Sequence, residues 1–149
     1  MSELKAKLSD AMKNAMRSKD KDTLTFARNL HAAIRKKEID GRVDLTDEDV
    51  QQIVGTMIKQ RQDSVEQFKK GGREDLVAQE EAEIAFLLHY LPPQMSEEEV
   101  NAIVSEVIGE VGASGAKDMG KVMQALMPRV RGKADGKLVN QIVKSKLGA

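Results

Sequence analysis

The chain has 149 residues, and its 24 basic side chains balance 24 acidic ones, so the formal net charge is zero. A chain of this length forms one average domain or two small ones. It contains no cysteine, which excludes a disulfide scaffold, a thiolate zinc site and a cysteine nucleophile.

The N-terminal segment predicts an amphipathic helix. Leu4, Leu8, Met12 and Met16 recur at four-residue steps, as expected for one buried helix face. Charged residues interrupt the segment every few positions, so it is neither a secretory signal nor a membrane span. We therefore expect a soluble, cytoplasmic protein with no membrane partner.

Two further helices follow. Apolar residues at helical spacing predict the second helix over residues 24–39, and it should end near Asp40 and Gly41, with the glycine taking the left-handed cap. Thr46 is a candidate N-cap of a long third helix, because three acids follow it and favour the positive end of the helix dipole. This helix should stop at the glycine pair 71–72.

A domain boundary is predicted at Pro92 and Pro93. The fourth helix runs through residues 76–91 and cannot continue, because the first proline disfavours helical geometry in the residue before it. We expect an N-terminal helical domain over residues 1–91 and a C-terminal tail domain over residues 96–149.

Three helices are predicted in the tail. Ser96 begins the first, which carries apolar residues through position 111. A short helix spans residues 122–127, and Asp135 is a candidate N-cap for the last one, which continues to Leu147. No segment alternates with a period of two, so we predict an all-α protein: a four-helix N-terminal unit followed by a three-helix tail.

Charge is separated within the tail. From Lys117 to Ala149 there are eight Lys or Arg against two acids, a net of +6, whereas residues 96–114 carry five Glu and no Lys or Arg. Such a separation favours an electrostatic partner over a purely structural tail.

Four strings of the sequence resemble the YqeY family. They are KQRQDSVEQFKKGGREDLVAQEEAEI at 59–84, YLPPQMSEEEV at 90–100, and the DMGKVM and GKADGKLVNQIV runs within 118–143. The tail of this family is shared with the GatB subunit of the glutamine-dependent aminoacyl-tRNA amidotransferases. The resemblance implies a three-helix GatB/YqeY-like tail and a tRNA-associated module. The catalytic region of the larger enzyme, which activates misacylated tRNA with ATP, has no counterpart in this chain.

The resemblance and the charge pattern together predict a phosphate-binding surface in the tail. The residues expected to contact phosphate are Lys121, Arg129, Arg131, Lys133 and Lys137. Around Arg131 and Lys133, glycines should also let phosphate approach backbone amides. The alternative is that lysine and glycine only form a soluble turn. No aromatic residue follows Tyr90, so recognition should depend on phosphate and shape rather than on base stacking.

A second surface is predicted around the 71–72 turn. It comprises Lys59, Arg61 and Arg73, which could approach tRNA or a protein partner. The alternative is a set of salt bridges along the helix faces.

Other motifs predict no cofactor and no metal. Residues 115–122 approach a phosphate-binding loop, but Val122 occupies the position that a Ser or Thr needs to hold magnesium. We expect Gly120 to be a close helix-packing position or a helix-start residue instead. Glu80 and Glu83 share a helix face two turns from His89, so we expect them to be solvated or to pair with Lys69, Lys70 or Arg73.

Three functions remain open on sequence grounds. The first is a non-catalytic protein that binds tRNA through its basic tail. The second is an adaptor that docks on an amidotransferase or an aminoacyl-tRNA synthetase. The third is an enzyme with carbon–nitrogen ligase activity, by family association only, because Ser64 has no histidine at helical spacing and no nucleophile–base pair is recognisable.

Overall fold

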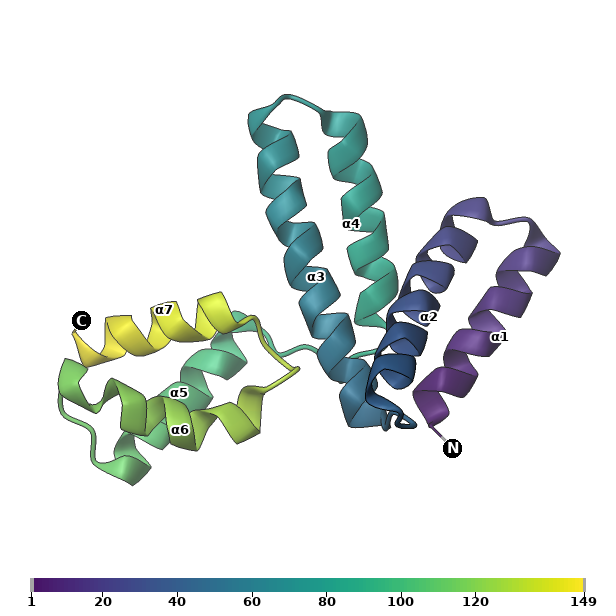
Figure 1. Ribbon diagram of the computed structural model, residues 1–149. Coiled ribbons are helices and arrows are strands. Elements are labelled where there is room, and N and C mark those ends of the chain that lie inside the picture. The colour runs from purple at the N-terminus through teal and green to yellow at the C-terminus, as the bar shows by residue number, and fades with distance from the viewer. Residues whose placement is uncertain (1, 149) are drawn as a thin grey trace. The chain divides into compact units, whose positions relative to one another are not determined.

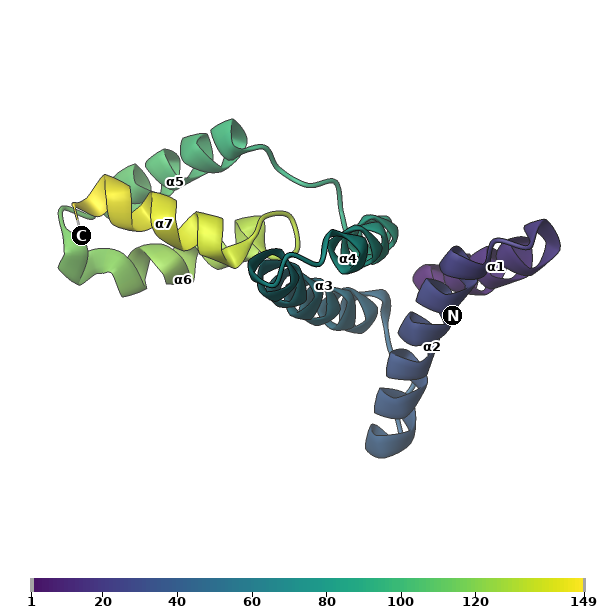
Figure 2. The same cartoon turned by 90° about the horizontal axis from the view of Figure 1, so that it is seen from above.

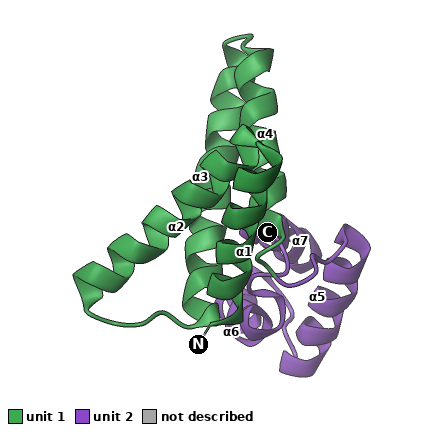
Figure 3. Cartoon of the chain, turned by 90° about the vertical axis from the view of Figure 1, so that its right-hand side faces the viewer, with its two compact units in different colours: residues 1–91 green, residues 92–149 purple. Residues whose placement is uncertain are grey.

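The computed structural model describes residues 2–148, which form seven α-helices, one short 3₁₀-helix and no strand. The predicted all-α class is confirmed. The chain divides into two compact units, residues 1–91 and 92–149, which are coloured separately in Figure 3. Within the described residues, no helix combines the length and the apolar composition needed to cross a membrane.

The first unit consists of two helical hairpins (Figure 1). One hairpin pairs α1 (Glu3–Ser18) with α2 (Lys21–Gly41), and the other pairs α3 (Asp47–Lys70) with α4 (Glu74–Leu88). Burial of their apolar faces is the main favourable contribution to folding of the unit. The buried core residues are Leu8, Ala27, Leu30, Ile34, Leu45, Val50, Ile53, Val54, Met57, Ile58, Leu87 and Tyr90.

Of two cap predictions for these helices, one is confirmed and one is wrong. Thr46 is the N-cap of α3, as predicted, and its side chain forms a reciprocal capping box with Asp49. The prediction that Gly41 takes the left-handed cap is wrong. The helix includes Gly41, and Arg42 is the left-handed residue, with φ of +50°. Its amide donates to the Ile39 carbonyl, and the Val43 amide closes the helix on the Glu38 carbonyl.

A buried carboxylate ties α1 to the segment between α2 and α3. Glu38 accepts from the Lys5 ammonium and from the Leu45 amide, the latter at 3.1 Å, and Arg35 lies 3.5 Å away. These donors, led by Lys5, lower the pKa of Glu38 to about 2. Lys5 also pairs with Asp44 at 2.6 Å, so one ammonium joins two acids.

The second unit packs α5 (Glu97–Val111), α6 (Met119–Val130) and α7 (Gly136–Leu147) around its own core, with the 3₁₀-helix η1 (Ala116–Asp118) before α6 (Figure 2). The core residues are Val100, Val104, Val107, Val122, Leu126, Val130, Val139, Ile142, Val143 and Leu147.

Three details of this unit bear on the sequence predictions. The predicted N-caps Ser96 and Asp135 are confirmed, since their side chains accept from the Glu99 and Lys137 amides. Gly120 is the second residue of α6, which confirms the helix-start interpretation. The close-packing alternative is wrong, because a Cβ on Gly120 would meet no heavy atom within 4 Å.

Candidate functional site

The turn between α6 and α7 is held in place by its own unit. The Met95 amide donates to the Lys133 carbonyl at 2.7 Å, and the Gln94 carboxamide donates to the Gly132 carbonyl at 2.9 Å. Gly132 has φ of +75°, a left-handed conformation that glycine adopts without strain. These contacts fix the backbone that carries Arg131 and Lys133.

Three backbone amides of this turn already donate to carbonyls of α6. Arg131 donates to the Met127 carbonyl at 2.9 Å, while Lys133 and Ala134 both donate to the Val130 carbonyl, at 2.9 and 3.1 Å. The sequence argument that phosphate could approach these amides therefore does not apply to them. At these three positions, anion recognition must come from the side chains.

The five predicted phosphate-binding residues fall into two groups. Lys121, Arg131, Lys133 and Lys137 are exposed. Arg129 is half-buried, because it pairs with Glu106 at 3.0 Å and lies 3.7 Å from Glu110. Among residues 2–148, Lys121, Arg131 and Lys133 form no salt bridge. Arg129 thus joins α6 to α5, whereas these three cations face solvent.

The charge separation seen in the sequence corresponds to separate helices. All five glutamates of residues 96–114 lie on α5, and the eight basic residues lie on η1, α6, α7 and the turn between α6 and α7. Arg129 neutralises acids of α5. The remaining basic charge is presented by segments that carry only Asp118 and Asp135 as acids.

The predicted second surface does not form a cluster of available cations. Arg61 pairs with Glu83 at 2.7 Å and with Glu80 at 3.7 Å, and Glu83 is buried. Arg73 pairs instead with the exposed Asp75 at 3.1 Å. Lys59 is exposed.

The partners expected for the two acids of α4 are therefore wrong, because Arg61 replaces Lys69, Lys70 and Arg73. Asn29 of α2 adds a hydrogen bond of 3.1 Å to Glu83. The sequence contains a signal for the Arg61 pairing. Arg61 precedes Gly71 by ten residues, while Glu80 and Glu83 follow Gly72 by eight and eleven, so an antiparallel hairpin brings them to the same level.

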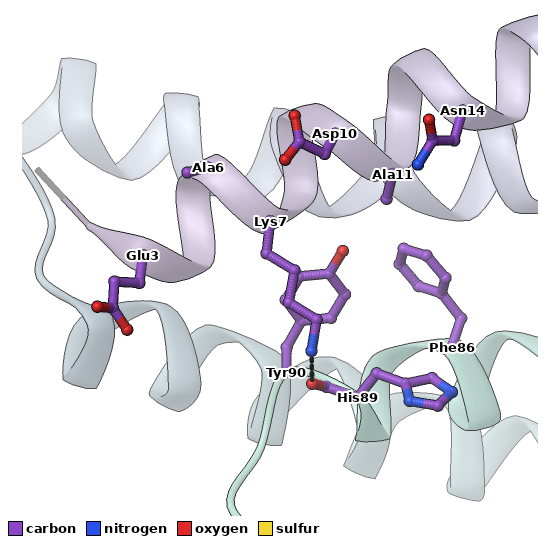
Figure 4. A pocket seen from close by; sticks show the side chains of 9 residues that line it. All are labelled: Glu3, Ala6, Lys7, Asp10, Ala11, Asn14, Phe86, His89 and Tyr90. Atoms are coloured by element: carbon purple, nitrogen blue, oxygen red, sulfur yellow. Dashed lines mark hydrogen bonds between the residues drawn. The ribbon is translucent and has the colours of Figure 1, made fainter.

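A groove between α1 and the end of α4 was not predicted. Its volume is about 630 Å³, and Figure 4 shows the nine side chains that line it. They are Glu3, Ala6, Lys7, Asp10, Ala11, Asn14, Phe86, His89 and Tyr90. Sequence reasoning missed this site because its two walls lie about 70 residues apart in the chain, so no local pattern joins them.

Metal-binding geometry is not found in the part of the chain that the structure describes. No group of three His, Asp or Glu side chains there could hold an ion.

Comparison with known proteins identifies relatives over almost the whole chain. The sequence profile of the family described as Yqey-like protein matches residues 5–147. A protein of Lachancea thermotolerans named Altered inheritance of mitochondria protein 41, mitochondrial, is 39% identical over 112 residues, covering 73% of this chain and 60% of that protein. The protein of the same name from Pyrenophora tritici-repentis is 31% identical over 141 residues, covering 93% of this chain and 77% of that protein. The chain thus spans three fifths of the first relative's length.

The names of these relatives contradict the cytoplasmic location expected from the sequence, because they are mitochondrial proteins. That expectation depended on the missing cysteines and on a charged N-terminal segment. Neither feature distinguishes one reducing compartment from another, so the cytoplasmic prediction is withdrawn.

Proposed function

The chain belongs to the Yqey-like protein family, and from that premise we propose that it is a non-catalytic, tRNA-associated binding protein. In this proposal, residues 92–149 engage tRNA through phosphate and shape, as a module related to the tail of tRNA-dependent amidotransferases. Exposed cations supply most of the affinity for a nucleic-acid backbone, and they do so without reading sequence.

One observation carries the proposal: Arg131 and Lys133 project from a turn whose backbone is fixed, and the described residues offer them no acid to pair with. Lys121 and Lys137 lie exposed on the two helices that flank the turn. A fixed backbone lowers the entropy lost when these side chains bind a rigid polyanion. All four aromatic residues of the chain precede residue 92, which favours phosphate over base stacking in this unit.

The test is binding to bulk tRNA across a salt series. For the wild-type protein, the logarithm of the binding constant should fall linearly with the logarithm of the salt concentration, because each phosphate contact releases counterions. The double variant Arg131→Glu with Lys133→Glu should bind at least about 10-fold more weakly near 0.1 M salt, and its salt slope should fall by about 2.

The matched control is Lys13→Glu with Lys36→Glu, which changes the net charge equally at two exposed positions of α1 and α2. This control should keep the wild-type slope. Equal affinity of the wild type and the Arg131 and Lys133 double variant would contradict the assignment to the turn. An equal loss in both double variants would indicate a general charge effect instead.

The second candidate is an adaptor that docks on an amidotransferase or an aminoacyl-tRNA synthetase. It is favoured by two exposed apolar side chains: Ile39 in the last turn of α2, 65% exposed, and Val43 just after the helix, 53% exposed. Capture of one of these enzymes that survives RNase treatment and is lost in Ile39→Ser with Val43→Ser would support it. Ligase activity has family association as its only support.

A further inference from the structure

Three of the chain's four aromatic side chains gather at one place in the first unit. The ring centroids of Phe26 and Phe86 are 6.2 Å apart, and those of Phe86 and Tyr90 are 5.4 Å apart. Phe86 and Tyr90 also line the groove between α1 and α4. Phe86 is half-buried, so part of its ring remains open to the groove (Figure 4).

Tyr90 has a polar group without a partner. The residue is only 2% exposed, yet its hydroxyl makes no hydrogen bond with any of residues 2–148. In Figure 4 the hydroxyl points away from α4 toward α1, into the groove. Burial raises the pKa of Tyr90 to about 12, so the group is a neutral donor and acceptor at pH 7. The hydroxyl is therefore available to hydrogen-bond a ligand in the groove.

Lys7 limits what the groove can accept. Its ammonium lies 5.0 Å from the centre of the Tyr90 ring and donates to the His89 carbonyl. This cation covers the Tyr90 ring, which leaves Phe86 as the aromatic face for a ligand. It also disfavours a second cation over Tyr90, because like charges repel.

The α1 wall combines small and polar side chains. Ala6 and Ala11 leave room opposite the aromatic rings, while the exposed Asp10 and Asn14 lie one helical turn apart on the same wall (Figure 4). The carboxylate accepts hydrogen bonds, and the carboxamide both donates and accepts. The groove therefore has an apolar floor and a hydrogen-bonding edge.

We propose that this groove binds a nucleobase, stacked on Phe86 with its edge toward the Tyr90 hydroxyl, Asp10 and Asn14. A base has the two properties that the groove matches: flat apolar faces, and an edge of donors and acceptors that carboxamide and carboxylate groups read. A purely apolar ligand would make no use of the hydrogen-bonding groups of Tyr90, Asp10 and Asn14. An anion would face the carboxylates of Glu3 and Asp10.

The volume of the groove also fits. About 630 Å³ lies within the range of small-molecule sites. The site belongs to residues 1–91 and needs no phosphate, so it does not depend on the proposed function of the basic turn.

The test uses the four ribonucleosides, which carry a base and no phosphate, with ribose as the base-free control. Tyr90 is the chain's one tyrosine, so the full-length protein labelled with 3-fluorotyrosine gives a single ¹⁹F resonance that reports on this site. We expect at least one nucleoside to shift that resonance saturably, while ribose leaves it unchanged.

Variants then locate the contact, with affinity measured by saturation-transfer NMR on the nucleoside. Tyr90→Phe keeps the ring and removes the hydroxyl, and it should weaken binding about 2- to 10-fold, the range for one neutral hydrogen bond. Asn14→Ala should weaken it by a similar factor, whereas Ser9→Ala, on α1 but not among the lining residues, should have no effect.

Two results would overturn the proposal. One is the absence of a saturable shift for all four nucleosides up to their solubility limits. The other is unchanged affinity in both Tyr90→Phe and Asn14→Ala. Neither result bears on tRNA binding at the turn, which the salt series tests separately. Conversely, nucleoside binding should survive Arg131→Glu with Lys133→Glu.

Discussion

Glu38 shows how one carboxylate can make folding sensitive to acid. Its donors, first Lys5 and then the Leu45 amide, lower its pKa from an ordinary 4.5 to about 2. A depressed folded-state pKa means that the unfolded state binds protons first as the pH falls. The contribution of Glu38 to stability is therefore complete above about pH 4.5 and is lost as the pH falls toward 2.

The variant Glu38→Gln removes this titration. We expect it to be less stable than the wild type at pH 7, with the difference shrinking between pH 4.5 and pH 2. Urea unfolding midpoints of both proteins across that range measure the effect. Glu66→Gln, at an exposed position of α3, is the control and should track the wild type. A constant difference between Glu38→Gln and the wild type at all pH values would contradict the linkage.

Single residues also show which features could be predicted from the sequence and which could not. Thr46, Ser96 and Asp135 were predicted as caps because a cap depends on the next three residues. The environment of Glu38 could not be predicted, since Lys5 and the Leu45 amide reach it from other segments. The unpaired Tyr90 hydroxyl was equally hidden, because nothing local to residue 90 reports what α1 brings opposite it.

At the scale of elements, Arg61 joins α3 to α4 through Glu80 and Glu83, and Asn29 extends the network to α2. Breaking a buried ion pair costs more than forming it contributes, because the remaining charges lose their partner. Arg61 is 32% exposed, so solvent screens part of this cost. We expect Arg61→Met to lower the free energy of unfolding by about 2 kcal/mol.

The double variant Arg61→Met with Glu83→Gln distinguishes the contribution of the ion pair to stability from that of side-chain packing. Neutralising Glu83 removes the orphaned charge, so the double variant should be more stable than Arg61→Met alone. Urea denaturation of the wild type, both single variants and the double variant gives the coupling energy. If the two single effects simply add, the network contributes packing only.

The Arg61 network also explains why the surface predicted around Lys59, Arg61 and Arg73 is not a cluster of available cations. Composition identified Arg61 and Arg73 as cations. The hairpin register places Arg61 beside the acids of α4, whereas Arg73 pairs locally with Asp75. The basic tail was easier to recognise because acids are nearly absent from residues 117–149. Even there, Arg129 pairs with α5, which a count of charges along the sequence does not reveal.

For the whole molecule, the two units bury separate cores. Residues 1–91 include twelve buried apolar residues in one cluster, and residues 92–149 include ten in another. A segment of 58 residues buries a smaller fraction of its unfolded surface than one of 91, so its stability should be lower. We therefore expect two unfolding transitions, with residues 92–149 melting first.

Substitutions at two glycines of the second unit test whether the units unfold independently, because one should lower the stability of that unit and the other should raise it. Gly132→Ala forces a side chain into a left-handed turn and should destabilise the unit by about 1 kcal/mol, which lowers its melting temperature by about 4–8 °C. Gly120→Ala, in α6 with open space around its Cβ, should stabilise the unit by up to about 1 kcal/mol.

Calorimetry with amide exchange at Leu30 and Val139, one buried residue from each core, follows the two units separately. Both substitutions should change exchange at Val139 and leave Leu30 as in the wild type. Equal changes in exchange at both amides would mean that the chain unfolds as one cooperative body. So would a single calorimetric transition whose calorimetric and van't Hoff enthalpies agree. In that case the basic turn and the α1–α4 groove could not be perturbed independently, because a substitution at either would alter the stability of both.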